Sequence, residues 1–272
     1  MPEPPPTATP VSGSRDDATN GPRAIQFRNV SYRLENGREL LHDLNLEVRR
    51  GETVVLLGRS GCGKTTTLKL INCLLTASSG DLQVEGRSLN EWDVIKLRRR
   101  IGYVIQEVGL FPHFTIEQNI GLVPKIEGWT KNRIHQRVEE LMRLAGLDPQ
   151  IAARYPHELS GGQRQRVGVA RALAADPPIL LMDEPFGALD PLTRVELQQE
   201  FLALQSRLRK SVVFVTHDLR EALLLADRIA LMDDGRLVTI LTPDEFTESR
   251  EPLVSAYVAA FSTSEKRDKE HR

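Results

Sequence analysis

The chain has 272 residues, enough for one large domain or two small ones, and its 40% hydrophobic and 27% charged residues are an ordinary globular balance. A formal net charge of −1 excludes a global electrostatic field that would draw the protein onto nucleic acid or anionic lipid. Its two cysteines, Cys62 and Cys73, exclude a disulfide framework and are typical of the reducing cytosol. The sequence has no apolar run near the roughly 18 residues of a membrane-spanning helix and no secretory signal pattern, so we expect any service to a membrane to need another chain that spans it.

The N-terminal part predicts a tail followed by strands. Residues 1–23 are rich in Pro, Ser, Thr, Gly and Asp, and they predict a disordered tail because they lack the apolar side chains that offset the entropy of ordering. Apolar patterning starts near Ala24 and predicts three strands and then a helix, at about 25–30, 44–48, 53–57 and 64–74.

The middle of the chain, roughly 107–164, predicts a mostly helical insertion. An amphipathic helix is indicated where apolar residues recur at i, i+3, i+4 and i+7, at Val138, Leu141, Met142 and Ala145. Strands return at 179–182 and 212–215, each followed by helical sequence, and this alternation favours an α/β fold with a parallel, helix-covered sheet.

The C-terminal part predicts a hairpin and a charged tail. Segments 228–232 and 236–241 flank Asp233-Asp234-Gly235, which is a hairpin signal. From about Ser262 to the last residue, 272, the sequence is highly charged, and we expect it to be a frayed tail.

A glycine-rich loop follows the third predicted strand and precedes the helix. It reads Gly58-Arg59-Ser60-Gly61-Cys62-Gly63-Lys64-Thr65 and fits the phosphate-loop pattern G-x-x-x-x-G-K-[ST] without a mismatch. Glycines let backbone N–H groups turn inward around phosphate oxygens, and the positive end of the following helix points at the same oxygens. We expect Lys64 to reach the β- and γ-phosphates, Thr65 to offer its hydroxyl to Mg²⁺, and Thr66 to complete this nucleotide-binding segment.

Two carboxylates end the apolar strand at 179–182. Asp183 and Glu184 come directly after it, and a carboxylate at the C-terminal end of a parallel strand projects into the ligand crevice. Asp183 is therefore expected to hold Mg²⁺, directly or through water, and Glu184 to polarise the attacking water as general base.

A third motif, Leu159-Ser160-Gly161-Gly162-Gln163, precedes a helical stretch, and Ser160 with Gln163 fits a helix-capping box. Here the chain resembles the ABC (ATP-binding cassette) ATPases, whose LSGGQ signature it reproduces. The resemblance covers roughly 24–247 and includes every diagnostic element in order, namely the phosphate loop, Gln106, the signature, Asp183-Glu184, Ala188-Leu189-Asp190 and His217. It implies a P-loop NTPase core of the RecA type, with an N-terminal antiparallel β subdomain and an inserted helical subdomain at about 107–164, over a cassette of 24–261.

The resemblance also implies a mechanism that one chain cannot complete. Two cassettes pack head to tail, and the signature of one faces the phosphate loop of the other across ATP, so the motif Ser160, Gly161, Gly162 and Gln163 is expected to bind the γ-phosphate. By resemblance Gln106 touches Mg²⁺ and the attacking water, and His217 contacts the γ-phosphate. Asp190 communicates across the dimer.

The residue that stacks on adenine is a departure from the family. In relatives it is an aromatic residue near the first strand, and here that position falls on Leu34. Tyr32 lies two residues earlier, on the same face of a strand, and is the candidate that moves into the role. Arg59 also occupies a position where Pro is common in relatives, with little consequence because the loop backbone does the binding.

A transporter subunit is favoured over the soluble relatives that act on DNA or ribosomes. Those relatives carry long coiled-coil insertions or two cassettes in one chain, and this chain has one cassette and no basic stripe for nucleic acid. A kinase with the same phosphate loop is disfavoured by the signature and by His217.

Among transporters, the closest resemblance is to importers of quaternary amines such as glycine betaine and choline. The stretches that carry it are 101–106, 109–113, 122–125, 155–159 and 167–177. The expected cofactors are ATP and Mg²⁺, and the expected partners are a membrane permease, a second copy of the ATPase and, through the complex, a solute-binding protein. We expect the chain at the cytoplasmic face of the membrane and without the paired CBS domains of many such ATPases. Amino acids, metals and lipids stay open as alternative cargos.

The segment 107–130 is expected to dock a helix of the permease. It offers four apolar anchors of the kind that fill a partner's hot spot, at Leu110, Phe111, Phe114 and Trp129. The alternative is that these side chains pack inside the helical insertion.

Overall fold

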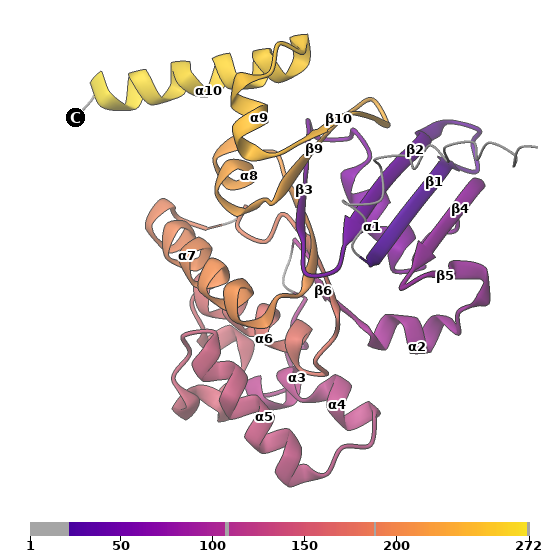
Figure 1. Ribbon diagram of the computed structural model, residues 1–272. Coiled ribbons are helices and arrows are strands. Elements are labelled where there is room, and N and C mark those ends of the chain that lie inside the picture. Colours follow the sequence, from indigo (N-terminus) through magenta and orange to yellow (C-terminus); the bar gives the residue numbers. More distant parts are fainter. Residues whose placement is uncertain (1–21, 107–108, 188, 271–272) are drawn as a thin grey trace, which may run out of the picture.

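Two β-sheets organise the chain in the computed structural model, which describes residues 22–106, 109–187 and 189–270. One is a four-stranded antiparallel sheet with the order β2-β1-β4-β5, and the other is a six-stranded sheet with the order β10-β9-β3-β8-β7-β6. In Figure 1 the antiparallel sheet lies on the right, the six-stranded sheet in the centre and the helical insertion at the bottom. The expected tail at 1–23 lies almost wholly outside the described residues.

The antiparallel sheet forms the N-terminal β subdomain. Strand β1 (Arg23–Arg33) pairs with β2 (Glu39–Arg49) on one side and with β4 (Ser79–Val84) on the other. The short β5 (Arg87–Ser88) extends the edge beyond β4. The first two strands confirm the predicted ones and are longer, whereas β4 and β5 were not predicted from the sequence.

The six-stranded sheet is mostly parallel and carries the predicted strands. Across the sheet its strands are β10 (Arg236–Leu241), β9 (Arg228–Asp233), β3 (Thr53–Leu57), β8 (Ser211–Thr216), β7 (Ile179–Asp183) and β6 (Ile101–Val104). All neighbours pair in parallel except β10, which forms the predicted antiparallel hairpin with β9. Every residue of β3, β7 and β8 is buried, because side chains that alternate along each strand face two separate hydrophobic clusters.

Helices cover both faces of the six-stranded sheet. Outside the insertion they are α1 (Lys64–Ile71), α2 (Val94–Arg99), α7 (Pro191–Leu208), α8 (Leu219–Leu225), α9 (Pro243–Glu248) and α10 (Pro252–Glu270). The expectation of a frayed tail from Ser262 was wrong for the backbone, since α10 continues to Glu270, and most residues from Glu265 onward are good helix formers. None of the described helices is long and apolar enough to cross a membrane.

The insertion is helical, as predicted. It contains α3 (Ile116–Ile120), α4 (Leu122–Ile126), α5 (Lys131–Leu144), the 3₁₀ turns η3 (Pro149–Ala153) and η4 (Pro156–Glu158), and the start of α6 (Gly161–Leu173). The predicted amphipathic face of α5 is present, with Val138, Leu141 and Met142 buried in the core cluster that α6 shares.

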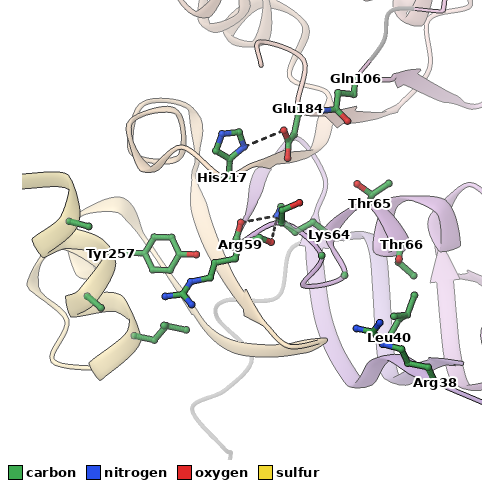
Figure 2. A pocket seen from close by; sticks show the side chains of 17 residues that line it. Arg38, Leu40, Arg59, Lys64, Thr65, Thr66, Gln106, Glu184, His217 and Tyr257 are labelled. Atoms are coloured by element: carbon green, nitrogen blue, oxygen red, sulfur yellow. Dashed lines mark hydrogen bonds and ion pairs between the residues drawn. The ribbon is translucent and has the colours of Figure 1, made fainter. Parts of the chain in front are cut away.

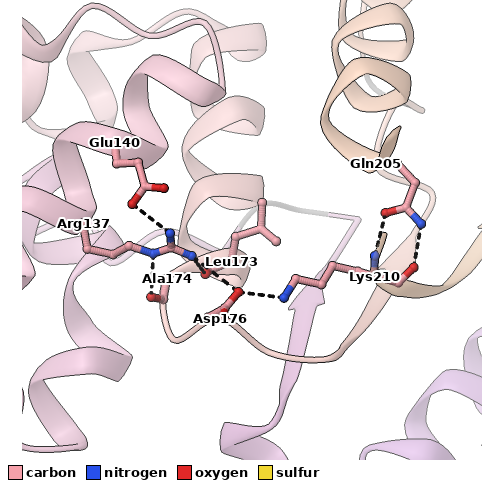
Figure 3. A network of polar contacts seen from close by, with 7 residues as sticks. All are labelled: Arg137, Glu140, Leu173, Ala174, Asp176, Gln205 and Lys210. Atoms are coloured by element: carbon pink, nitrogen blue, oxygen red, sulfur yellow. Dashed lines mark hydrogen bonds and ion pairs between the residues drawn. The ribbon is translucent and has the colours of Figure 1, made fainter. Parts of the chain in front are cut away.

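A polar network fastens this insertion to the six-stranded sheet (Figure 3). Arg137 of α5 donates hydrogen bonds to the carbonyl oxygens of Leu173 and Ala174, at 3.1 and 3.3 Å, where α6 ends. Asp176 lies 3.8 Å from Arg137 and accepts a 2.6 Å hydrogen bond from Lys210, which precedes β8. The C-terminal end of α6 is therefore anchored, whereas its N-terminal end points away from the anchor.

A partly buried ion pair joins the start of β3 to β9. The guanidinium of Arg228 donates to both carboxylate oxygens of Glu52, at 2.5 and 2.9 Å, and the N–H of Arg49 adds a 2.7 Å bond. Burial raises the pKa of Glu52, but the hydrogen bonds and charge of Arg228 outweigh it and leave the pKa lowered. The pair therefore stabilises the fold above the ordinary pKa of a glutamate, and this stability is lost as the pH falls through the lowered pKa.

Replacement of Glu52 by Ala is expected to lower the free energy of unfolding by about 3 kcal/mol at neutral pH, because it leaves a partly buried guanidinium uncompensated. Urea unfolding followed by circular dichroism measures the change. The matched control is Arg143→Ala, which breaks the exposed pair with Glu139 (3.0 Å) and is expected to cost about 0.5 kcal/mol or less. Equal losses in the two variants would contradict the role of the Glu52 pair.

Candidate nucleotide site

A cavity with a volume of about 870 Å³ opens at the carboxyl edge of the six-stranded sheet (Figure 2). It collects residues from segments far apart in the sequence. Its walls are formed by Arg38, Leu40, Gly58, Arg59, Ser60, Gly61, Gly63, Lys64, Thr65, Thr66, Gln106, Glu184, His217, Leu253, Ala256, Tyr257 and Ala260. The predicted phosphate loop, Gln106, Glu184 and His217 thus share one cavity. Cys62 belongs to the same loop, but its side chain is buried and is not part of the cavity wall.

Glycine is required in the loop between β3 and α1 for two different reasons. Gly61 and Gly63 have φ of +83° and +103°, a backbone conformation that L side chains rarely adopt. A Cβ at Gly58 would lie 2.4 Å from the carbonyl oxygen of Met232. The loop consequently turns tightly and brings the N-terminus of α1, with its unpaired N–H groups, to the cavity.

Lys64 spans this loop from its first helical position. Its ammonium donates hydrogen bonds of 2.8 Å to the carbonyl oxygens of Gly58 and Arg59, and the residue is only 4% exposed. The loop backbone therefore holds a cation beside the N-terminus of α1, where an anionic group would meet both.

Oxygen ligands for a divalent cation lie next to Lys64. The hydroxyl of Thr65 donates a 2.9 Å hydrogen bond to the carboxylate of Asp183 at the end of β7. Burial raises the pKa of Asp183, and the Thr65 hydrogen bond opposes this. A hydroxyl and a carboxylate side by side match the oxygen ligands of Mg²⁺, which takes only one or two protein ligands when phosphates and waters supply the rest. The described residues hold no cluster of three or more His, Cys, Asp or Glu suited to a metal.

Sequence reasoning missed Tyr103, which lies on β6 close enough to the Asp183 carboxylate to feel its charge. Burial and the Asp183 charge raise the pKa of the Tyr103 phenol, so it stays neutral. The signal that could have found Tyr103 was the strand pairing: β6 and β7 pair in parallel, so residues near the carboxyl end of β6 lie beside those near the carboxyl end of β7.

Glu184 and His217 face each other at neighbouring strand ends. The Nδ1 atom of His217 lies 3.2 Å from a carboxylate oxygen of Glu184, and the backbone N–H of Glu184 donates to the carbonyl oxygen of Val215 at 3.0 Å. Glu184 has a φ of +43°, which is strained for a residue with a Cβ and turns its side chain from the strand toward the cavity. A carboxylate and an imidazole are thus paired beside the loop that holds Lys64.

The signature residues lie outside this cavity. Ser160 caps α6, and the predicted capping box is present, with Ser160 Oγ accepting from the N–H of Gln163 at 3.2 Å and Gln163 Oε1 accepting from the N–H of Ser160 at 2.9 Å. Ser160 and Gly161 are exposed, and Gly162 is buried against Thr193. Asp190 likewise caps another helix, α7, outside the cavity, and accepts from the N–H of Thr193 at 3.1 Å.

The candidate for adenine is not brought into the cavity wall. Tyr32 is half-buried on β1 against the N-terminal core, and among described residues the wall has Arg38 and Leu40 instead. Figure 2 shows these two at one end of the cavity and Tyr257 of α10 at the other. Sequence reasoning missed all three, and the one signal for the first two was Asn36-Gly37, a hairpin dipeptide between β1 and β2.

A glycine-rich loop between a parallel strand and a helix, with Mg²⁺-type ligands at the end of another parallel strand of the sheet, defines a P-loop nucleoside-triphosphate-binding protein. Comparison with protein families then identifies the group: a family model described as ABC transporter matches residues 41–187. The chain belongs to this family.

Two curated relatives illustrate the similarity. The choline transport ATP-binding protein OpuBA of Bacillus subtilis is 52% identical over 221 residues, which are 81% of this chain and 58% of OpuBA. The osmoprotectant import ATP-binding protein OsmV of Salmonella typhimurium is 57% identical over 204 residues, which are 75% of this chain and 53% of OsmV. The chain therefore spans just over half the length of these relatives.

A solved structure gives the fold match. The ATP-binding cassette MJ0796, described as a dimer in a post-hydrolysis state bound to ADP and Pi, matches with a TM-score of 0.73 and 34% identity. The match covers 80% of this chain and 98% of that one. The predicted P-loop NTPase fold, with its antiparallel β subdomain and helical insertion, is confirmed.

Proposed function

We propose that this chain is the ATP-hydrolysing subunit of an ABC importer. The observation that carries the proposal is the cavity in which the Glu184–His217 pair (3.2 Å) stands beside the phosphate loop and Lys64. A base, a cation and a row of backbone N–H groups converge there, and hydrolysis of a phosphoanhydride needs these three.

Phosphate binding falls to the loop and to Lys64. The backbone N–H groups of 60–65 and the N-terminal end of α1 bind phosphate oxygens, and the ammonium of Lys64 exchanges its loop carbonyl partners for the β- and γ-phosphates. Thr65, Asp183 and Gln106 would hold Mg²⁺. When bound, the ion neutralises charge on the phosphates.

Glu184 acts as the general base. Its carboxylate polarises a water that attacks the γ-phosphorus, and the imidazole of His217 keeps this carboxylate oriented and contacts the γ-phosphate. The strained backbone of Glu184 supports this role, since strain of this kind is retained where geometry is part of the mechanism.

A second copy of the chain completes the site. Ser160 and Gly161 are exposed at the N-terminus of a 13-residue helix and are not part of their own cavity wall, and this end suits an anion. Two copies arranged head to tail bring the motif of each, with Gly162 and Gln163, to the γ-phosphate of the other. Asp190 lies in a segment that communicates between the two copies in this arrangement.

The base of the nucleotide is assigned to Arg38 and Leu40, in place of Tyr32. A guanidinium and an isobutyl group at one end of the cavity offer a cation over the π-face and an apolar surface for a purine. Replacement of Leu40 by Asp is expected to weaken binding of a fluorescent ATP analogue, and unchanged binding would count against this assignment.

The predicted docking surface faces the permease at the cytoplasmic side of the membrane. Phe111 is 41% exposed and lies against Phe114 (ring centroids 5.3 Å apart), while Arg133 lies over the ring of Trp129 at 3.5 Å. Leu110 packs partly on the core, as the alternative expected. The aromatic residues offer anchors for a partner helix, with Glu107 and Val108 outside the described residues.

The proposed cargo is a quaternary amine such as glycine betaine or choline. Relatives named for choline transport and osmoprotectant import, at 52% and 57% identity, support this cargo, and a solute-binding protein would select it.

In a strain that lacks this gene, uptake of labelled glycine betaine and choline should fall, and it should return with the wild type but not with Lys64→Ala or Phe111→Asp. Purified Phe111→Asp should still hydrolyse ATP. Unchanged uptake of both solutes, with an amino acid, metal or lipid phenotype instead, would reject the cargo and leave the ATPase assignment standing.

A further inference from the structure

A buried carboxylate lies directly behind His217, outside the nucleotide cavity. Glu221, in the first turn of α8, is only 4% exposed. Its Oε2 accepts a 2.6 Å hydrogen bond from the hydroxyl of Thr216, and its Oε1 accepts a 3.2 Å bond from the amide of Gln198. A small second cavity has Glu184, His217 and Glu221 together in its walls.

The hydrogen bonds of Thr216 show that a hydrogen-bond acceptor is needed at position 221. The Thr216 oxygen accepts the backbone N–H of Asp218 at 3.0 Å, so its single proton is directed to Glu221. Thr216 and Asp218 flank His217 on both sides. A carboxylate at 221 therefore holds Thr216 directly, and the oriented Thr216 hydroxyl in turn holds Asp218 on the other side of His217.

The same carboxylate ties this turn to another helix. Gln198 is a buried residue of α7, and Arg194 of the same helix lies 3.7 Å from the carboxylate of Asp218. Helix α7 begins directly after its cap, Asp190. Glu221 thus links the His217 turn to the helix that starts at Asp190.

Burial of a carboxylate at this place has a cost that packing alone would avoid. Burial raises the pKa of Glu221, which records the unfavourable transfer of its charged form from water, and the hydrogen bond from Thr216 opposes this. An apolar side chain would fill the space without that penalty, so the hydrogen bonds are the reason for a carboxylate here.

We infer that Glu221 is a positioning residue of the hydrolytic site: it holds the turn that presents His217 to Glu184 and locks this turn to the helix that begins at Asp190. The inference rests on the proposed ATPase function. It assigns Glu221 no contact with nucleotide, since its carboxylate oxygens are engaged by Thr216 and Gln198.

The test compares three variants by steady-state phosphate release and by titration of a fluorescent ATP analogue. Glu221→Ala should lower kcat by about 10- to 100-fold, because a small misplacement of His217 is costly, and should change the dissociation constant by less than about twofold. Glu221→Gln should recover most of the rate. The amide oxygen of the new side chain can accept the Thr216 hydrogen bond, and Gln198 can rotate its own amide so that its oxygen accepts a hydrogen bond from the new NH₂ group. Thr216→Val keeps the shape without the hydroxyl and should lower kcat even if Glu221→Ala does not fold.

A matched control and a double variant separate positioning from general stability. Glu52→Ala removes another buried carboxylate, at the start of β3 and thus at the far end of the strand from the loop, and should lower Tm with kcat within about twofold of wild type. In a His217→Ala background, Glu221→Ala should add no further loss of kcat.

Two results would overturn the inference alone: wild-type kcat in both Glu221→Ala and Thr216→Val, or a loss of kcat in Glu52→Ala as large as that in Glu221→Ala at a similar loss of Tm. A wild-type chain without turnover would instead overturn the proposed function, and the inference with it.

Discussion

Replacement of Glu184 by Gln is expected to lower steady-state ATP hydrolysis by about 10²- to 10⁴-fold and to leave nucleotide binding intact. In the wild type the imidazole of His217 lies 3.2 Å from the Glu184 carboxylate. The amide of the variant keeps the size of the side chain and this contact, but it cannot take a proton from water. Phosphate release measured with saturating Mg²⁺ and ATP gives the rate, and titration of a fluorescent ATP analogue gives the affinity.

The same variant should accumulate as a dimer in ATP but not in ADP, because the γ-phosphate that is proposed to join the two copies would not be released. Light scattering coupled to gel filtration reports the mass in each nucleotide. Glu248→Gln, which changes an exposed carboxylate on α9, is the matched control and should behave as wild type. Normal turnover by Glu184→Gln would remove Glu184 from the mechanism, and a monomer in both nucleotides would contradict the two-copy site.

Replacement of Lys64 by Ala is expected to weaken ATP binding by roughly 10- to 100-fold, the loss that follows from one or two charge-assisted hydrogen bonds. The ammonium is held by two loop carbonyl oxygens at 2.8 Å, so its removal also loosens the loop that it spans. Isothermal titration with ATP and with ADP measures the effect.

The loss on Lys64→Ala should be larger for ATP than for ADP, since the γ-phosphate is one of the expected contacts. Lys96→Ala, on the exposed surface of α2, removes the same charge outside the cavity and should leave both affinities within about twofold. Affinities of Lys64→Ala equal to those of Lys96→Ala would show that the loop does not bind phosphate.

Strands that are buried on both faces could be predicted closely from the sequence. The segment Thr53–Leu57 is apolar except for its first residue and lies between Gly51-Glu52 and Gly58, and β3 has these same bounds because both faces of the strand need apolar side chains. Strand β4 was missed for the opposite reason. Ser79–Val84 begins Ser-Gly-Asp, and only Leu82 and Val84 are buried. Its pairing with β1, and not local propensity, therefore makes it a strand.

The site divides in a similar way. The placement of Lys64 in its loop and of Glu184 at a strand end could be predicted, because the motif and the local backbone geometry involve the same few residues. The other walls depend on segments that meet only after folding. Leu40 and Tyr257 are 217 positions apart in the sequence (257 − 40 = 217) and line one cavity, and no local pattern records such a meeting.

The link from Glu221 to His217 could not be predicted for the same reason. The two residues are close in sequence, yet the function of Glu221 depends on Gln198, which comes from another helix. Periodicity predicts that Glu221 lies on α8 but not which side chain meets it.

Release of inorganic phosphate by the purified wild-type chain tests the central claim most directly. We predict release from ATP that requires Mg²⁺, rises more than linearly with protein concentration because two copies form each site, and disappears in Glu184→Gln. Release no greater than that of Glu184→Gln at every protein concentration, with correctly folded protein and excess Mg²⁺ and ATP, would contradict the assignment of this cavity as an ATP-hydrolysing site.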